Sequence, residues 1–219
     1  MKRFVGPAAM AFTLLACGGD DSSSAPATTA PNDSAVERSG RCVVRLHGKG
    51  GDGAPDEIVA ETTIVSPSGN DEAGDGRQWL YFPEDRYAEA VDVITAATEG
   101  CEQVIIDGFS NGGSFAAKLY CRGETLGGRL VRVVIDDPVV DGGVVDCSPA
   151  PAVGVALYWT GALESTAVPG WDCEEGGWTC EGGTTIGIDA YAAALGTEVL
   201  ASPFDEHEWY LDAPELSQW

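Results

Sequence analysis

The stretch Val104-Ile105-Ile106-Asp107-Gly108-Phe109-Ser110-Asn111-Gly112-Gly113 places a serine between two glycines, shortly after an apolar run. A continuous apolar run is typical of a buried parallel strand, and the residues from Ser114 to Cys121 follow a helical pattern. The order G-x-S-x-G between a strand and a helix indicates a sharp turn, because glycines remove side chains that would clash across it. We therefore predict that Ser110 is held out from the sheet, at the positive end of the following helix, as a candidate nucleophile.

Strand and helix patterns alternate along the rest of the chain. Apolar, β-branched runs predict strands at 42–46, 62–65, 104–106, 130–135, 153–158 and 198–201. The helical spacing of apolar residues predicts helices at 86–98, 114–121 and 188–195. Strands separated by helices form βαβ units, so the sequence predicts an α/β fold with a mainly parallel sheet flanked by helices.

A serine hydroxyl is a weak nucleophile unless a general base lies beside it. The chain contains two histidines, His47 and His207. His47 precedes Ser110, whereas His207 follows the last predicted strand, where a hydrolase with the chain order serine, acid, histidine places its base. We therefore predict His207 as the base.

Three motifs together resemble the α/β-hydrolase superfamily: His47-Gly48-Lys49-Gly50-Gly51, the Gly108–Gly113 turn and the late His207. Their spelling is similar to that of small carboxylesterases, acyl-protein thioesterases, dienelactone hydrolases and polyhydroxybutyrate-depolymerase-like lipoproteins. The resemblance covers roughly residues 42–212 and implies a minimal α/β-hydrolase fold. The chain has no insertion long enough for a large cap, so we expect an exposed site.

The resemblance also implies which acid pairs with the base. The loop Gly161-Ala162-Leu163-Glu164 is similar to the loop that carries the acid in many α/β-hydrolases, so Glu164 is the expected partner of His207. Its role would be to orient the imidazole and to stabilise its charged form. The other candidates are Asp137, Asp141 and Asp172.

The turn from His47 to Gly51 resembles the oxyanion turn of the same enzymes. The resemblance implies that the backbone N–H of Lys49 points into the site, and the residue after the nucleophile, Asn111, supplies a second N–H. Two such donors stabilise the negative oxygen that develops during acyl transfer.

Taken together, these residues imply a serine hydrolase that cleaves carboxylic esters through an acyl-enzyme intermediate, with no metal and no organic cofactor. Because carboxylates are abundant around the predicted site, we expect a small neutral ester as the substrate rather than an anion. Two alternatives stay open. One is a catalytically inactive hydrolase fold that binds a ligand or partner at the cell surface, and the other is a peptidase of the same fold.

The N-terminus reads as an export signal. Lys2 and Arg3 precede the apolar stretch Phe4–Ala16, and Leu14-Leu15-Ala16-Cys17 resembles the lipobox of bacterial lipoproteins, which implies cleavage before Cys17 and attachment of lipid to it. The Ser-, Ala-, Pro- and Thr-rich residues that follow cannot bury apolar surface. We expect a signal peptide at 1–16, a disordered tether at 17–40 and a hydrolase domain at 41–219, anchored by its lipid on the extracytoplasmic face of the membrane.

The remaining cysteines are even in number, which indicates disulfides in an exported protein. We expect Cys173–Cys180 around a Gly-rich loop, Cys42–Cys101 because each residue opens an apolar strand, and Cys121–Cys147 as the pair that remains. No C-x-x-C pair occurs in the sequence, which argues against a zinc site.

Charge and length exclude several other classes of protein. The 219 residues include 12 Lys and Arg against 35 Asp and Glu, which gives a formal net charge of −23. Nucleic-acid binding requires clustered Lys or Arg, so we expect none. No apolar run reaches the ~18 residues of a membrane-spanning helix. We expect a monomer whose membrane contact is the lipid anchor alone.

Overall fold

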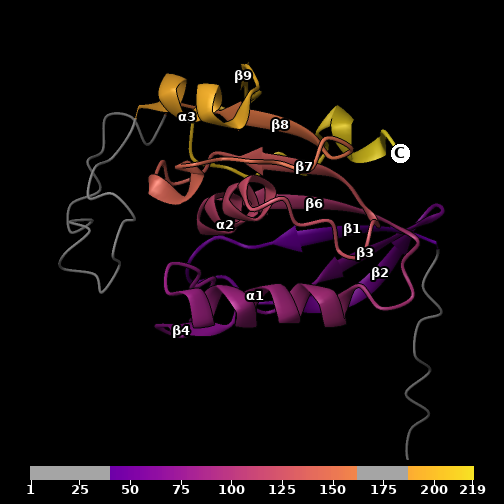
Figure 1. Cartoon of the computed structure of the whole chain (residues 1–219). Coiled ribbons are helices and arrows are strands. Elements are labelled where there is room, and N and C mark those ends of the chain that lie inside the picture. The colour runs from indigo at the N-terminus through magenta and orange to yellow at the C-terminus, as the bar shows by residue number, and fades with distance from the viewer. Residues whose placement is uncertain (1–39, 162–186) are drawn as a thin grey trace, which may run out of the picture. The chain divides into compact units, whose positions relative to one another are not determined.

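The computed structural model describes residues 40–161 and 187–219 (Figure 1). The expected signal peptide at 1–16 and the expected lipidation site Cys17 lie outside the described residues, as does the tether up to residue 39. Within the described ranges, no helix is both long enough and apolar enough to cross a membrane.

In the described part of the chain, seven strands form one sheet in the order β2-β3-β1-β6-β7-β8-β9. They are β1 (Arg41–Leu46), β2 (Ala54–Val59), β3 (Thr62–Ser66), β6 (Gln103–Phe109), β7 (Leu130–Asp136), β8 (Gly154–Trp159) and β9 (Val199–Ala201). β2 runs antiparallel to β3, and every other neighbouring pair in this sheet is parallel. The carboxyl ends of β1, β6 and β7 therefore lie side by side, which is where open α/β sheets place their sites.

The α-helices of the described part pack against one face of the sheet. They are α1 (Glu84–Ala97), α2 (Asn111–Cys121) and α3 (Ile188–Leu195) (Figure 1). One apolar core joins Ile94 of α1, Phe115 of α2 and Tyr191 of α3 to the strands. Every residue of α2 is buried, so this helix is fixed from all sides.

The opposite face of the sheet is covered by the C-terminal segment. Its apolar strand residues, among them Ile105 and Val134, pack with Tyr210 and Leu216. Leu216 belongs to the short 3-10 helix η2 (Pro214–Ser217). The segment before η2 carries His207, so this packing bears directly on the site.

The α/β fold with a mainly parallel sheet is confirmed, as is each strand and helix expected from the sequence. No large cap is present in the residues that the structure describes. The sequence did not predict β2 or the small hairpin of β4 (Asp71–Ala73) and β5 (Gly76–Gln78). β2 reads Ala-Pro-Asp-Glu-Ile-Val and is mostly exposed, so it lacks the apolar pattern of a buried strand.

Two disulfides join the described elements, and both are pairings expected from the sequence. Cys42–Cys101 ties β1 to the residues before β6, and Cys121–Cys147 ties the end of α2 to the segment that follows β7. The expected Cys173–Cys180 pair lies outside the described residues.

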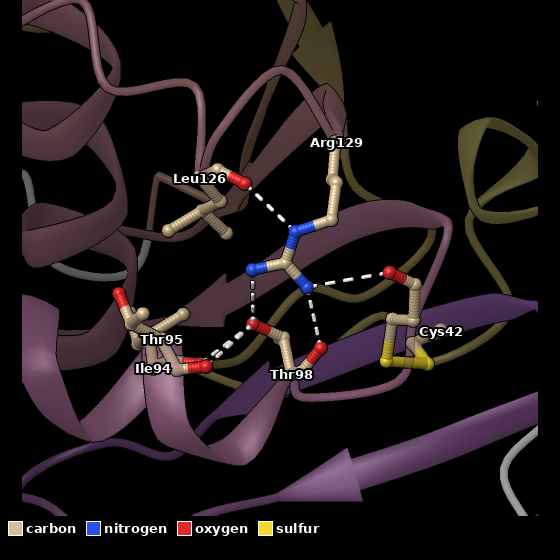
Figure 2. Close-up of a disulfide and its surroundings, with 7 residues drawn as sticks. Cys42, Ile94, Thr95, Thr98, Leu126 and Arg129 are labelled. Carbon is tan, nitrogen blue, oxygen red and sulfur yellow. Dashed lines mark hydrogen bonds between the residues drawn. A yellow bond between two sulfur atoms is a disulfide. The ribbon is translucent and has the colours of Figure 1, made fainter.

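Arg129 lies next to the Cys42–Cys101 disulfide and is hydrogen-bonded to the backbone around it (Figure 2). Its guanidinium donates to the carbonyl oxygens of Leu126 at 2.8 Å, Cys101 at 3.3 Å and Thr98. The bond to Thr98, the C-cap residue of α1, satisfies a carbonyl group at the C-terminal end of that helix. The turn after α1 and the start of β6 are thereby fixed together.

Candidate active site

Ser110 lies on the sharp turn between β6 and α2, as the motif predicted. Its φ of 54° falls in the left-handed region, which a non-glycine residue adopts only under strong local constraint. The turn is held by two backbone bonds, from Ser110 N–H to the Asp136 oxygen and from Ser114 N–H to the Ser110 oxygen, each at 3.0 Å. A strained, well-bonded serine of this kind is the geometry of a nucleophile elbow.

The glycines of the motif are required by close backbone contacts. A Cβ added at Gly112 would lie 2.1 Å from the Leu46 carbonyl oxygen, and one added at Gly108 would lie 2.4 Å from the Gly112 oxygen. Neither contact can be relieved by moving a flexible side chain. The spacing G-x-S-x-G therefore follows from the packing of β6 and α2 against the end of β1.

His207 lies against Phe109, the residue that precedes Ser110. Its imidazole stacks on the ring of Phe109, with centroids 4.5 Å apart. Its Nδ1 is hydrogen-bonded to the Asp137 carboxylate. Because a carboxylate only accepts hydrogen bonds, Nδ1 carries the proton and Nε2 is left to exchange protons with a substrate or a nucleophile.

The acid bonded to His207 is Asp137, which was one of the alternative acids in the sequence analysis. Glu164, the acid expected from the resemblance, lies outside the described residues. Asp137 follows β7 directly and is fully buried, with a φ of 43°. Its carboxylate accepts from the Thr160 backbone N–H at 3.1 Å and from the Thr160 hydroxyl at 2.9 Å. These bonds fix the carboxylate before it meets the imidazole.

Of the other two candidate acids, the structure describes only Asp141, which is hydrogen-bonded to residues other than His207. Asp141 accepts from the Tyr81 hydroxyl and from the Gly143 backbone N–H, each at 2.7 Å, and caps the short helix η1 (Gly142–Val144). Asp172 lies outside the described residues.

The glycine turn after β1 packs directly on Ser110. A Cβ added at Gly48 would lie 3.2 Å from the Cβ of Ser110. The Gly48 carbonyl accepts from His47 Nδ1 at 2.8 Å and from the Gly51 N–H at 3.0 Å. Because the peptide bond is trans, the N–H of Lys49 points away from this fixed carbonyl. The direction of the Lys49 N–H is therefore set by the turn.

The sequence did not assign His47 a role, but the structure shows what this side chain does. His47 is buried, and its Nε2 accepts from the Gly69 N–H at 3.0 Å while its Nδ1 donates to Gly48. Burial lowers the pKa of His47, so the ring stays neutral with its proton on Nδ1. The position of His47 at the start of a glycine turn was the sequence feature that could have indicated its role in holding the turn.

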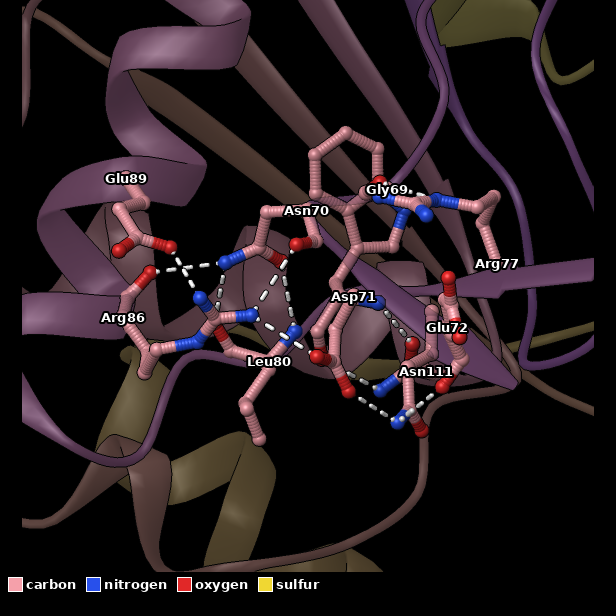
Figure 3. A network of polar contacts seen from close by, with 11 residues as sticks. Gly69, Asn70, Asp71, Glu72, Arg77, Leu80, Arg86, Glu89 and Asn111 are labelled. Atoms are coloured by element: carbon pink, nitrogen blue, oxygen red, sulfur yellow. Dashed lines mark hydrogen bonds and ion pairs between the residues drawn. The ribbon is translucent and has the colours of Figure 1, made fainter.

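Asn111 is fixed through its side chain as well as through the helix. Its Oδ1 accepts from the Trp79 N–H at 2.7 Å, and its Nδ2 donates to the Trp79 oxygen at 3.1 Å. Asn111 is almost completely buried, so these bonds are made away from water. The residue after the nucleophile is thus tied to the segment that follows β5 (Figure 3).

The β4–β5 hairpin is bonded to the glycine turn and to α1, and Figure 3 shows its contacts with Arg86 of α1. Arg77 of β5 pairs with the turn through bonds from the Gly50 N–H at 2.8 Å and to the Gly51 oxygen at 2.6 Å. On the helix side, the Arg86 guanidinium donates to the Asn70 oxygen at 3.0 Å and pairs with Asp71 at 2.9 Å. The glycine turn is therefore bonded to a hairpin that is itself bonded to α1.

Two further buried carboxyl groups, Asp107 and Asp136, lie on the strands next to the site. Burial raises the pKa of both Asp107 and Asp136 to about 7. Both groups are fully buried, Asp107 within β6 and Asp136 at the end of β7. In the described residues, no cluster of His, Cys, Asp and Glu could hold a metal ion.

No protein-family model and no curated protein matches the sequence. Among solved structures, the chain is similar to a carboxylesterase from Bacillus cereus, with 15% identity over 81% of this chain and 84% of that chain and a TM-score of 0.49. The likeness is one of fold. YahD determined with malic acid shares 14% identity over 80% of this chain and 88% of its own, with a TM-score of 0.44. A protein of unknown function from Agrobacterium tumefaciens shares 19% identity over 79% and 85%, with a TM-score of 0.45.

Proposed function

We propose that the protein is a serine hydrolase that cleaves carboxylic esters with Ser110 as nucleophile, His207 as base and Asp137 as the acid that orients the base. The observation that carries this proposal is the His207–Asp137 hydrogen bond beside a serine held at a φ of 54°. A surface histidine with no catalytic role has no need of a buried, pre-bonded carboxylate. Asp137 here replaces Glu164 as the acid of the proposed triad.

The proposed reaction begins when the Ser110 hydroxyl attacks the ester carbonyl and His207 Nε2 accepts its proton. The imidazole becomes charged, and the adjacent Asp137 carboxylate stabilises that charge. The backbone N–H groups of Lys49 and Asn111 stabilise the oxyanion of the tetrahedral intermediate. His207 then protonates the leaving alcohol, and water activated by the same imidazole hydrolyses the acyl-enzyme and regenerates Ser110.

The substrate class is proposed from charge. With a formal net charge of −23, the chain repels anions approaching its surface. Asp205, Glu206 and Glu208 flank His207 in the sequence and add local negative charge. Small neutral esters therefore suit the site better than phosphoesters or dicarboxylates. We also propose that the protein acts as a lipoprotein at the cell surface, on the strength of the N-terminal sequence alone.

A fluorophosphonate tests the proposal, because this reagent reacts covalently with a serine only when a base activates it. Intact mass of the wild type should increase by one adduct, and Ser110→Ala and His207→Gln should stay unmodified. Ser68→Ala is the matched control, because Ser68 is a described serine whose hydroxyl donates to the exposed carboxylate of Asp52 at 2.6 Å.

The same experiment separates the open alternatives. Labelling at Ser110 followed by turnover of p-nitrophenyl esters supports the esterase. Labelling with turnover of aminoacyl amides and not of esters would point to the peptidase. A folded wild type that takes up no reagent would contradict catalysis and favour a binding protein built on this fold.

A further inference from the structure

His207 lies on a segment without regular secondary structure, so its position needs an explanation. Between β9 and η2, the backbone bonds of residues 204–213 join residues within the segment, among them Glu208 N–H to Glu206 at 2.8 Å and Leu211 N–H to Trp209 at 3.1 Å. In the described residues, no backbone ladder attaches this stretch to the sheet. Side chains on the strands must therefore hold it.

Two buried aspartates hold the segment next to His207. Asp107 of β6 accepts from the Trp209 indole N–H at 3.2 Å, and Asp136 of β7 accepts from the Tyr210 backbone N–H. β6 and β7 are neighbours, with Asp107 opposite Val134 and Phe109 opposite Asp136. The two carboxylates therefore lie on the same face of the sheet, which is the face that the segment covers.

The aromatic rings extend this attachment to the imidazole. Phe109 stacks on His207 and also on Trp209, with centroids 5.7 Å apart in the second pair. Trp209 is thus fixed at both its N–H, by Asp107, and its ring, by Phe109. A movement of Trp209 or Tyr210 would be transmitted along two or three residues of backbone to His207.

These aspartates are expensive to bury, which argues that they serve more than packing. Both side chains are fully buried, and one oxygen of each, Asp107 Oδ2 and Asp136 Oδ1, has no hydrogen-bond partner in the described structure. A buried carboxyl group with an unsatisfied oxygen destabilises the fold relative to an apolar residue of similar size. What each group gains is a single hydrogen bond, and that bond goes to the segment of His207.

We propose that Asp107 and Asp136 are positioning residues that place the His207 imidazole between Ser110 and Asp137 by holding Trp209 and Tyr210. This inference rests on the proposed function in one respect, because that proposal gives His207 the role of base. In the described structure, the hydrogen bonds of the two carboxylates go to Trp209 and Tyr210 rather than to Ser110 or His207.

The test compares two substitutions at each aspartate. Asp107→Asn and Asp136→Asn keep an oxygen that can accept the same bond, whereas Asp107→Leu and Asp136→Leu remove it in a side chain with the same branching and the same number of non-hydrogen atoms. We expect each Leu variant to lower kcat for a p-nitrophenyl ester by about 10- to 100-fold, because small misplacements of a catalytic group have effects of this size. KM should change by less than about threefold, and the Asn variants should keep kcat within about threefold of wild type.

A second readout does not depend on catalysis. The proton on His207 Nδ1, shared with Asp137, should give a strongly downfield proton NMR signal, which assignment distinguishes from that of the only other histidine, His47. This signal should persist in the Asn variants and be lost to exchange in the Leu variants. Leu variants that keep both the signal and wild-type kcat would overturn the proposal.

Two further variants separate positioning from stability. Tyr158→Phe removes the 2.5 Å bond from the Tyr158 hydroxyl to Glu215 of η2, at the far end of the same segment, and should lower Tm while leaving kcat unchanged. If the Leu variants do not fold, Trp209→Phe removes the donor to Asp107 while keeping an aromatic ring against Phe109, and it should reproduce the loss of kcat and of the signal. An unchanged Trp209→Phe enzyme would contradict the proposal.

The failure of this inference is distinguishable from the failure of the proposed function. A wild type that shows the downfield signal but hydrolyses no ester would contradict the esterase. In that case, loss of the signal in the Leu variants alone would still support the positioning role, and its persistence would overturn it.

Discussion

His207 Nδ1 is hydrogen-bonded to the carboxylate of Asp137, although 70 residues separate the two along the chain. β7 brings Asp137 to the carboxyl edge of the sheet, next to the end of β6 that carries Ser110. Thr160, which directly follows β8, fixes the other side of the same carboxylate. Three adjacent strands thus converge on the acid, and the histidine arrives from the C-terminal segment.

We predict that Asp137→Asn lowers kcat for a p-nitrophenyl ester by roughly 10²–10⁴-fold. The amide cannot stabilise a charged imidazole and can impose the wrong tautomer on it. Steady-state kinetics on the purified variant measure the effect. Glu164→Gln is the comparison and should stay within about twofold of wild type. A large loss of kcat in Glu164→Gln with little change in Asp137→Asn would show that Glu164, and not Asp137, is the acid.

The hydrogen bonds of His47 lead to a prediction about the oxyanion turn. His47→Ala removes the acceptor for the Gly69 N–H and one of the two bonds to the Gly48 oxygen, so the direction of the Lys49 N–H is less firmly fixed. Loss of one oxyanion donor lowers kcat by ~10²–10³-fold, and we expect a partial loss of about 10- to 100-fold here. Pre-steady-state acylation kinetics resolve the step.

Lys49→Ala is the matched control for His47→Ala, because it removes a side chain and leaves the backbone N–H in place. Its kcat should change by less than about twofold if the backbone acts as proposed. A loss in Lys49→Ala as large as that in His47→Ala would show that the turn works through the lysine side chain instead.

The Cys121–Cys147 disulfide closes a loop of sequence separation 26 that contains β7 and Asp137. Replacing both cysteines by serine should lower the free energy of unfolding by about 3 kcal/mol, since the unfolded chain gains conformational freedom. For a domain of this size, that corresponds to a fall in Tm of about 6–12 °C. Urea unfolding of oxidised wild type and double variant provides the measurement. Identical midpoints would contradict the expectation.

Stability should depend on pH through Asp107 and Asp136. Burial raises the pKa of each carboxyl group from 3.8 to about 7 in the folded protein. At Asp107, the charge of Arg45 opposes this rise in pKa. At Asp136, the charge of Asp137 adds to the rise and the charge of His207 opposes it. Between pH 4 and pH 7 the folded state therefore binds more protons than the unfolded state. The free energy of unfolding contributed by these groups falls as pH rises through that window.

Asp107→Asn carries no charge to bury, so we expect its Tm at pH 8 to exceed that of wild type by about 2–8 °C. The gain should vanish near pH 4, where the wild-type carboxyl is neutral in both states. Thermal unfolding at the two pH values measures the difference. Asp52→Asn is the control, because hydrogen bonds from Ser68 and Gly53 lower the pKa of exposed Asp52 and its removal should give no gain at pH 8. A gain for Asp107→Asn that is equal at both pH values would contradict the ionisation account.

The sequence predicted the parts of the site that depend on local constraint. The glycines around Ser110 and after His47 are positions where a side chain would clash with backbone, so they are visible without a structure. His207 could be chosen because the chain has one other histidine and a fixed order of motifs. The alternation of strands and helices followed from apolar runs that are buried in the fold.

The acid could not be chosen in the same way. The chain has 35 Asp and Glu residues, and which of them meets His207 depends on how β7 and the C-terminal segment pack. A weak signal was present at Asp107 and Asp136, because each directly follows three apolar strand residues, where a charged residue is unusual. The exposed strand β2 gave no signal, because its residues bury little apolar surface.

His207 follows every strand of the sheet along the chain, and this order governs when the proposed enzyme can become active. A growing polypeptide completes β1, β6 and α2, and with them the nucleophile, long before the base has been synthesised. An unfinished chain therefore carries a serine that cannot attack esters. Activity begins only after the residues beyond β9 have docked, so a truncated translation product would be inert rather than partly active.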